Sequence, residues 1–160
     1  MLKLGLATAV VVAILDQLSK ALILAHFAGR AFGIDTFTPF FNLVLTLNRG
    51  MSFGMFNAAP GSGGGLNVVL FSLAAVVIVV GLIYWLSRVG SPLLAVAIGL
   101  IVGGAVGNVV DRIRYGAVVD FLDFHIGNYH WPAFNLADSA ICLGVVVMLF
   151  DSLLLRREAH

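Results

Sequence analysis

The chain has 160 residues, of which 61% are hydrophobic and 11% are charged, with a formal net charge of +1. A soluble globular domain carries roughly a quarter charged residues, so this composition and a mean hydropathy of +1.06 indicate a membrane protein. The small net charge excludes the clustered Lys and Arg of a nucleic-acid interface. The single cysteine, Cys142, excludes a disulfide framework and a cysteine-based zinc site.

Four apolar stretches are long enough to cross a membrane, which takes about 20 helical residues for about 30 Å of hydrocarbon. They cover 4–27, 66–86, 92–110 and 139–155. These runs are too long and too continuously apolar for barrel strands. The fold class that we expect is therefore an all-α membrane protein, a single integral domain over 1–160 with four transmembrane helices. The first stretch is interpreted as a retained span, because no convincing cleavage site follows it.

Four crossings place segments 28–65 and 111–138 on one side of the membrane and both termini on the other. Positive charges are densest beside the helix ends on the side of the termini, in short segments that carry Lys3, Arg88, Arg156 and Arg157. The positive-inside rule then predicts cytoplasmic termini and makes 28–65 and 111–138 extracytoplasmic. The polar residues that a membrane resists gather near this extracytoplasmic face.

In the first helix, Asp16 and Lys20 stand four residues apart in the favourable acid-before-base order. This spacing predicts an ion pair on one helix face. The pair either locks the helix against its neighbours or supports an adjacent active site, and the two interpretations are compatible.

Residues 40–56 break the helical period, because apolar residues alternate with others on both sides of a turn at 48–50. The alternation predicts a small β-hairpin with one apolar face, which would lie on the lipid surface or over the helices. Asn48 makes this hairpin a candidate substrate cradle. The alternative is a loop without ligand contact.

The third helix carries Gly99, Gly103 and Gly107 at intervals of four residues. Small residues at this spacing let two helices approach closely in lipid. The row of glycines continues to Asp111, and the neighbouring row contains Gly104, Asn108 and Arg112. The glycines therefore bring another helix close to the point where the polar residues begin.

Asp111, Asp120 and Asp138 compete for catalytic roles, with Asp123 a weaker fourth. Asp111 adjoins Arg112, which favours a structural ion pair. Asp120 lies among apolar residues, and burial there would raise its pKa. Asp138 opens the fourth helix, where it or Asn135 could be the N-cap. Two carboxylates held together can share one proton, one acting as base on a water and the other as acid.

Other chemistries and functions compete with a carboxylate pair. A metal site could use Asp120, Asp123, His125 and His130, but their spacing matches no established ligand pattern, and we expect no metal. A transporter or proton channel would need acids along a path through the membrane, whereas these acids cluster at one face and no inverted repeat is visible. A structural assembly factor gives no reason for so many acids that are costly to place beside a membrane.

Five motifs carry a family resemblance: DQLSK (16–20), NRGMSFG (48–54), GNVVDR (107–112), VVDF (118–121) and FNLADS (134–139). Their order and spacing, over nearly the whole chain, closely resemble signal peptidase II, the bacterial lipoprotein signal peptidase. The resemblance implies an aspartic endopeptidase of the bacterial cytoplasmic (inner) membrane, with four helices and an extracytoplasmic β-cradle. Such an enzyme cuts the signal peptide from a prolipoprotein immediately before the lipidated cysteine.

The motif match places Asp120 and Asp138 at the family's catalytic positions. Its other recurring positions, for substrate binding or support of the site, fall on Asp16, Lys20, Asn48, Gly50, Asn108, Asp111, Arg112, Asn135 and Ala137. Ser52 stands where the family usually has alanine. The resemblance also implies prolipoprotein substrates (signal helix plus diacylglyceryl cysteine), contact with membrane lipids, no nucleic-acid partner and no cofactor. We expect the protein to be a monomer.

Overall fold

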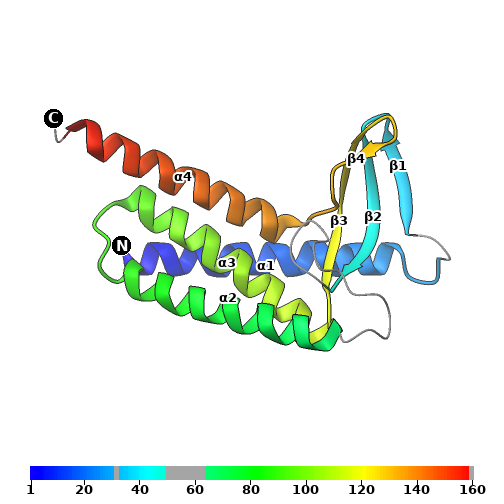
Figure 1. Cartoon of the computed structure of the whole chain (residues 1–160), viewed down its shortest axis with the longest axis horizontal. Coiled ribbons are helices and arrows are strands. Elements are labelled where there is room, and N and C mark those ends of the chain that lie inside the picture. Colours follow the sequence, from blue (N-terminus) through cyan, green and yellow to red (C-terminus); the bar gives the residue numbers. More distant parts are fainter. Residues whose placement is uncertain (31–32, 50–63, 159–160) are drawn as a thin grey trace.

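The computed structural model describes residues 1–30, 33–49 and 64–158 of the chain. Figure 1 shows a bundle of long helices with a small antiparallel sheet at one end. The elements in chain order are α1 (Leu2–His26), β1 (Ile34–Thr38), β2 (Phe41–Asn48), α2 (Gly64–Leu86), α3 (Pro92–Tyr115), β3 (Val118–Ile126), β4 (Tyr129–His130) and α4 (Leu136–Glu158). Within the described residues, three helices are long and apolar enough to cross a membrane: α1, the Leu66–Leu86 part of α2, and α3.

The central helix is α3, which packs against α1, α4 and α2. Its buried residues include Ala95, Ile98 and Val102, which form an apolar core with Ala9 of α1 and Leu86 of α2. By contrast, α2 exposes most of its apolar side chains. Exposed apolar side chains over a whole helix are expected where lipid, rather than water, is the solvent.

The glycines of α3 lie at its contacts with two neighbouring helices. A Cβ added at Gly99 or Gly103 would overlap backbone carbonyl oxygens of α1, and one at Gly104 would overlap the carbonyl oxygen of Ala137 in α4. The close approach predicted from the glycine spacing is therefore confirmed. It brings the backbones of α1 and α4 against α3 on two adjacent rows.

The sheet has the strand order β1-β2-β3-β4, and every pair is antiparallel. Figure 1 shows it at the end of the bundle opposite to both chain termini. One face packs on the end of α1, where Phe121 of β3 contacts Ile23 and Phe27. The sheet is thus fixed to the C-terminal end of α1, the helix that contains Lys20.

The strand predicted from Phe41 onward is confirmed, but its observed partners were not predicted. It pairs with β1 across a short turn at 39–40, and Asn48 at its other end pairs with Val118 of β3. The predicted second arm of the hairpin, 51–55, lies outside the described residues. Segment 111–138, expected as a loop, contains both β3 and β4, because pairing with β2 gives β3 partners that its local sequence does not supply.

Two helix boundaries differ from the prediction in ways that affect the site. The third helix was expected to end at 110 but continues to Tyr115, and Gly116 closes it with a left-handed φ of 65°. Asp111 therefore lies inside the helix rather than at its end. The fourth helix begins at Leu136, earlier than the expected 139, so Ala137 and Asp138 belong to its first turn.

Candidate active site

Asp120 and Asp138 reach one small polar cavity from different elements. Asp120 is in β3 and Asp138 is in the first turn of α4, and their side chains are 1% and 6% exposed. The residues that line the cavity with them are Asn48, Asn108, Arg112 and Val118. The structure thus brings together the two carboxylates that the family resemblance placed at the catalytic positions.

Asn135 links the backbone of Asp138 to the carboxylate of Asp120 through both ends of its side-chain amide. Its Oδ1 accepts a hydrogen bond of 2.9 Å from the backbone N–H of Asp138, and its Nδ2 donates one of 2.7 Å to Asp120 Oδ1. Asn135 is therefore the N-cap of α4, which settles a question that the sequence left open between Asn135 and Asp138. The carboxylate of Asp138 is not used as the cap and lines the cavity instead.

The other oxygen of Asp120 is held by β2, where Asn48 Nδ2 donates a 3.0 Å hydrogen bond to Oδ2. Burial is the main cause that raises the pKa of Asp120, from its ordinary 3.8 to about 7. The bonds from Asn48 and Asn135 act in the opposite direction, and the charge of Asp138 adds to the rise in pKa. The rise expected from the apolar sequence around Asp120 is confirmed.

Asp138 is held by the central helix. Asn108 Nδ2 donates a hydrogen bond of 2.9 Å to Asp138 Oδ1. The amide oxygen of Asn108 faces the other way, where it accepts from Lys20 Nζ at 3.0 Å and from Asn135 Nδ2 at 3.2 Å. Three asparagines, from β2, α3 and the start of α4, therefore surround the carboxylate pair with amide donors.

A buried ion cluster lies behind these asparagines. Lys20 Nζ is 2.8 Å from Asp16 Oδ2 and 2.8 Å from Asp111 Oδ2, and all three side chains are at most 2% exposed. The predicted Asp16–Lys20 pair is confirmed. The expected ion pair of Asp111 is also present, but its partner is Lys20 and the expectation of Arg112 was wrong, because consecutive residues of a helix do not face each other.

The carboxylates of this cluster also fasten the elements that carry the candidate catalytic residues. Asp16 Oδ1 accepts a hydrogen bond of 3.0 Å from the backbone N–H of Ala137. Asp111 Oδ2 accepts one of 3.1 Å from the backbone N–H of Val119. Gln17, which sequence reasoning missed, donates to Asp111 Oδ1 at 2.8 Å. Its position in the DQLSK motif was the available signal.

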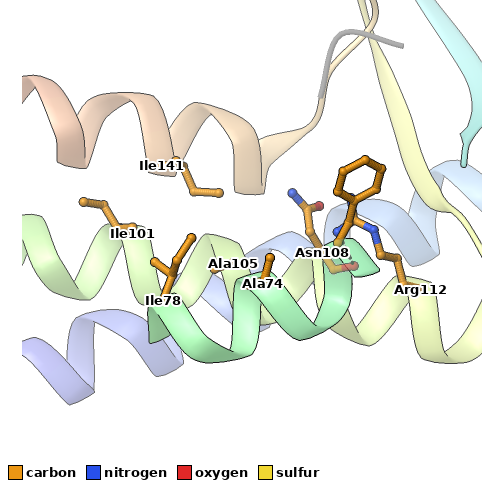
Figure 2. A pocket seen from close by; sticks show the side chains of 9 residues that line it. Ala74, Ile78, Ile101, Ala105, Asn108, Arg112 and Ile141 are labelled. Atoms are coloured by element: carbon orange, nitrogen blue, oxygen red, sulfur yellow. Dashed lines mark hydrogen bonds between the residues drawn. The ribbon is translucent and has the colours of Figure 1, made fainter. Parts of the chain in front are cut away.

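An apolar groove leads away from the carboxylates between α2, α3 and α4. Its volume is about 340 Å³, and it is lined by Phe71, Ala74, Ala75, Ile78, Ile101, Ala105, Asn108, Arg112 and Ile141. Figure 2 shows Asn108 and Arg112 together at one end, with the isoleucines at the other. These two polar residues line both the groove and the small cavity, so the groove adjoins the cavity that holds the carboxylate pair.

Asp123 lies in a different environment from Asp120, although both are on β3. Asp123 accepts a hydrogen bond of 2.8 Å from Asn42 Nδ2, and its carboxylate lies 2.9 Å from His130 Nδ1. No set of three His, Cys, Asp or Glu side chains within the described residues is arranged to hold a metal ion. Gly50 and Ser52, two positions of the NRGMSFG motif, lie outside the described residues.

Residues 8–154 match the family described as signal peptidase (SPase) II. Among curated relatives, the lipoprotein signal peptidase of Paraburkholderia phymatum is 47% identical over 150 residues, which cover 92% of this chain and 86% of the relative. The lipoprotein signal peptidase of Burkholderia mallei is 45% identical over 149 residues with the same coverage.

Two solved structures of bacterial membrane enzymes, both obtained by the in meso method, share the fold. One, at 2.3 Å resolution, has a TM-score of 0.76 and 31% identity over 93% of this chain and 87% of that chain. The other, at 1.9 Å resolution, has a TM-score of 0.74 and 30% identity, and the match covers 93% of this chain and 92% of that chain.

Proposed function

The chain belongs to the signal peptidase II family, and on that premise we propose that it is an aspartic endopeptidase for lipoprotein precursors. It removes the signal peptide from diacylglyceryl-modified prolipoproteins, immediately before the lipidated cysteine. The observation that carries the aspartic assignment is the cavity that Asp120 and Asp138 line together, buried and surrounded by three asparagine amides.

The mechanism uses one proton held between the two carboxyl groups. The ionised carboxylate takes a proton from a water as the water oxygen attacks the scissile carbonyl carbon, and the protonated carboxyl donates to the carbonyl oxygen. When the tetrahedral intermediate collapses, the C–N bond breaks and the leaving amine takes a proton from the pair. A pKa of about 7 for Asp120 supports this scheme, because such a group still holds a proton in part of the population at neutral pH.

The groove supplies a route for an apolar substrate. Its alanines and isoleucines suit a signal helix or an acyl chain, and its polar end lies at the carboxylate pair. A buried methylene contributes about 0.8 kcal/mol, so acyl chains would add substantially to binding. Arg112 at the junction of groove and cavity brings a positive charge close to the carbonyl oxygen as negative charge develops there.

The positions of the charges and of the sheet support a proposed orientation in the membrane. All four helices cross the bilayer, the sheet and the carboxylate pair lie at the extracytoplasmic face, and both termini are cytoplasmic. Lys3 and Arg88 lie near the end of the bundle that carries the chain termini, which is the end that the positive-inside rule assigns to the cytoplasm.

The deciding experiment is cleavage by the purified full chain in detergent. A lipidated prolipoprotein should be cut immediately before the modified cysteine, and the same precursor with an unmodified cysteine should be cut poorly or not at all. Activity should persist in a metal chelator, because no ion takes part. Absence of cleavage by a folded protein would overturn the proposal, and equal turnover of both precursors would remove the role of the acyl chains.

A further inference from the structure

The hydrogen-bonding capacity of Lys20 dictates how the amide of Asn108 is turned. An ammonium group only donates, so the Asn108 atom that lies 3.0 Å from Lys20 Nζ must be the oxygen. The nitrogen then faces Asp138 Oδ1 at 2.9 Å. Asn135 is oriented by the same logic, since its oxygen must accept from the backbone N–H of Asp138.

We propose that Lys20 is a positioning residue for the cleavage reaction, acting through Asn108 on Asp138. This inference rests on the proposed function. With the Asn108 amide held this way, Asp138 Oδ1 accepts a hydrogen bond from an N–H group. Such a bond favours the ionised carboxylate over the protonated carboxyl group, so Asp138 is kept in the form that can act as base.

Without the ammonium group, only the longer 3.2 Å hydrogen bond from Asn135 Nδ2 holds the Asn108 oxygen, and the amide rotates more readily to present that oxygen to Asp138. That arrangement favours a protonated Asp138, which would donate to the amide oxygen and could no longer accept a proton from water. The charged groups around Asp138, within the described residues, are Arg112 and Asp111 on α3, Lys20 and Asp16 on α1, and Asp120 on β3. Of these, only Lys20 donates to the Asn108 amide.

The test must remove the ammonium donor without changing the charge of the buried cluster. Lys20, Asp16 and Asp111 together carry −1, and the double variant Lys20→Met/Asp111→Asn keeps −1 on Asp16. It is compared with the wild-type chain, which carries the same cluster charge and retains the donor, and Asp111→Asn alone controls for the loss of the Asp111 carboxylate. We expect kcat on a lipidated precursor to be about 100-fold lower in the double variant than in the wild type, with KM little changed. The acidic limb of the pH–rate profile should move to higher pH.

Equal kcat values and superimposable pH profiles would overturn the inference and leave Lys20 a charge-balancing residue. Failure of the wild-type chain to cleave would instead overturn the proposed function, so the two outcomes are distinguishable. A charge-balancing role alone predicts lower yield in the double variant but no shift of the pH profile.

Two further variants decide the matter if the double variant does not fold. Asn108→Asp keeps an oxygen on Lys20 but replaces the N–H group that faces Asp138, so it should fold, lose kcat and show the same shift of the acidic limb. Lys20→Arg substitutes another group that only donates, and it should keep the wild-type pH profile. Wild-type kcat in Asn108→Asp, or a shifted profile in Lys20→Arg, would contradict the role assigned to Lys20.

Discussion

Asp16 Oδ1 accepts a hydrogen bond of 3.0 Å from the backbone N–H of Ala137, although 121 positions separate the two residues in the chain. The bond joins the middle of α1 to the first turn of α4. The other oxygen of Asp16 binds Lys20, which also binds Asp111 of α3. Three helices are therefore connected through one buried acid–base cluster at the end of the bundle that carries the carboxylate pair.

This cluster predicts an order of destabilisation. Lys20→Met leaves two buried carboxylates without their cation and should lower the free energy of unfolding by about 3–5 kcal/mol. Asp111→Asn leaves the Asp16–Lys20 pair intact and should cost less, though enough to reduce yield or thermal stability. Asp35→Asn removes a partly exposed bridge to Arg30 and should cost least, since water screens it. Thermal unfolding in detergent gives the ranking, and an effect of Lys20→Met no larger than that of Asp35→Asn would contradict it.

The carboxylate pair predicts two equivalent losses of activity. Asp120→Asn and Asp138→Asn should each abolish nearly all cleavage while the protein still folds and binds a lipidated precursor, and the double variant should be scarcely worse. Asp123→Asn is the matched control, because Asp123 lies on the same strand but binds Asn42 and His130. It should keep its turnover. Substantial cleavage by either single variant, with Asp123→Asn inactive, would show that the wrong carboxylates were assigned.

The raised pKa of Asp120 predicts a pH-dependent cost to stability. Between pH 4 and 7 the folded state holds this proton and the unfolded state does not, so stability should fall as pH rises through that window and then level off. The rise of about three pH units in the pKa of Asp120 corresponds to a change of at most about 4 kcal/mol in the free energy of unfolding. Asp120→Asn lacks this proton, so its thermal stability relative to wild type should improve from pH 4 to pH 7. A difference that does not vary with pH would contradict the assignment.

The groove predicts a steric effect on substrate binding. Ala74→Trp places a large side chain among the groove-lining residues, and kcat/KM for a lipidated precursor should fall about tenfold or more. Val80→Trp is the control, because Val80 is 62% exposed and lies on the opposite face of α2. Similar kinetics for the two variants would remove the groove from the substrate path.

The membrane orientation predicts which positions an impermeant thiol reagent reaches. In a Cys142→Ala background, cysteines at Ala28 and Asn128, both exposed, should be labelled from outside intact cells. A cysteine at Gly90, where a Cβ meets no neighbour within 4 Å, should be labelled only after the cells are opened. Labelling of Ala28 and Asn128 from opposite sides would contradict the shared extracytoplasmic face.

Helices and their close approach could be predicted from local pattern, because the apolar runs and the Gly99–Gly103–Gly107 spacing are properties of single segments. The Asp16–Lys20 pair was predictable for the same reason, as one helical turn separates the two residues. The partnership of Lys20 with Asp111 and the pairing of Asn48 with Val118 were not. Both join segments far apart in the sequence, and no local periodicity encodes which strand edge or helix face will meet.

Asn135 makes the starting residue of α4 a determinant of the site geometry. The oxygen of its side-chain amide caps the N-terminus of α4, and the nitrogen of the same amide holds Asp120. If α4 slid by one residue along its axis, the helix would lose its cap and Asp138 would move away from Asp120 in the same step. Insertion depth and helix register are therefore under the same constraint as the spacing of the two carboxylates, and a chain that inserts out of register would be both less stable and inactive.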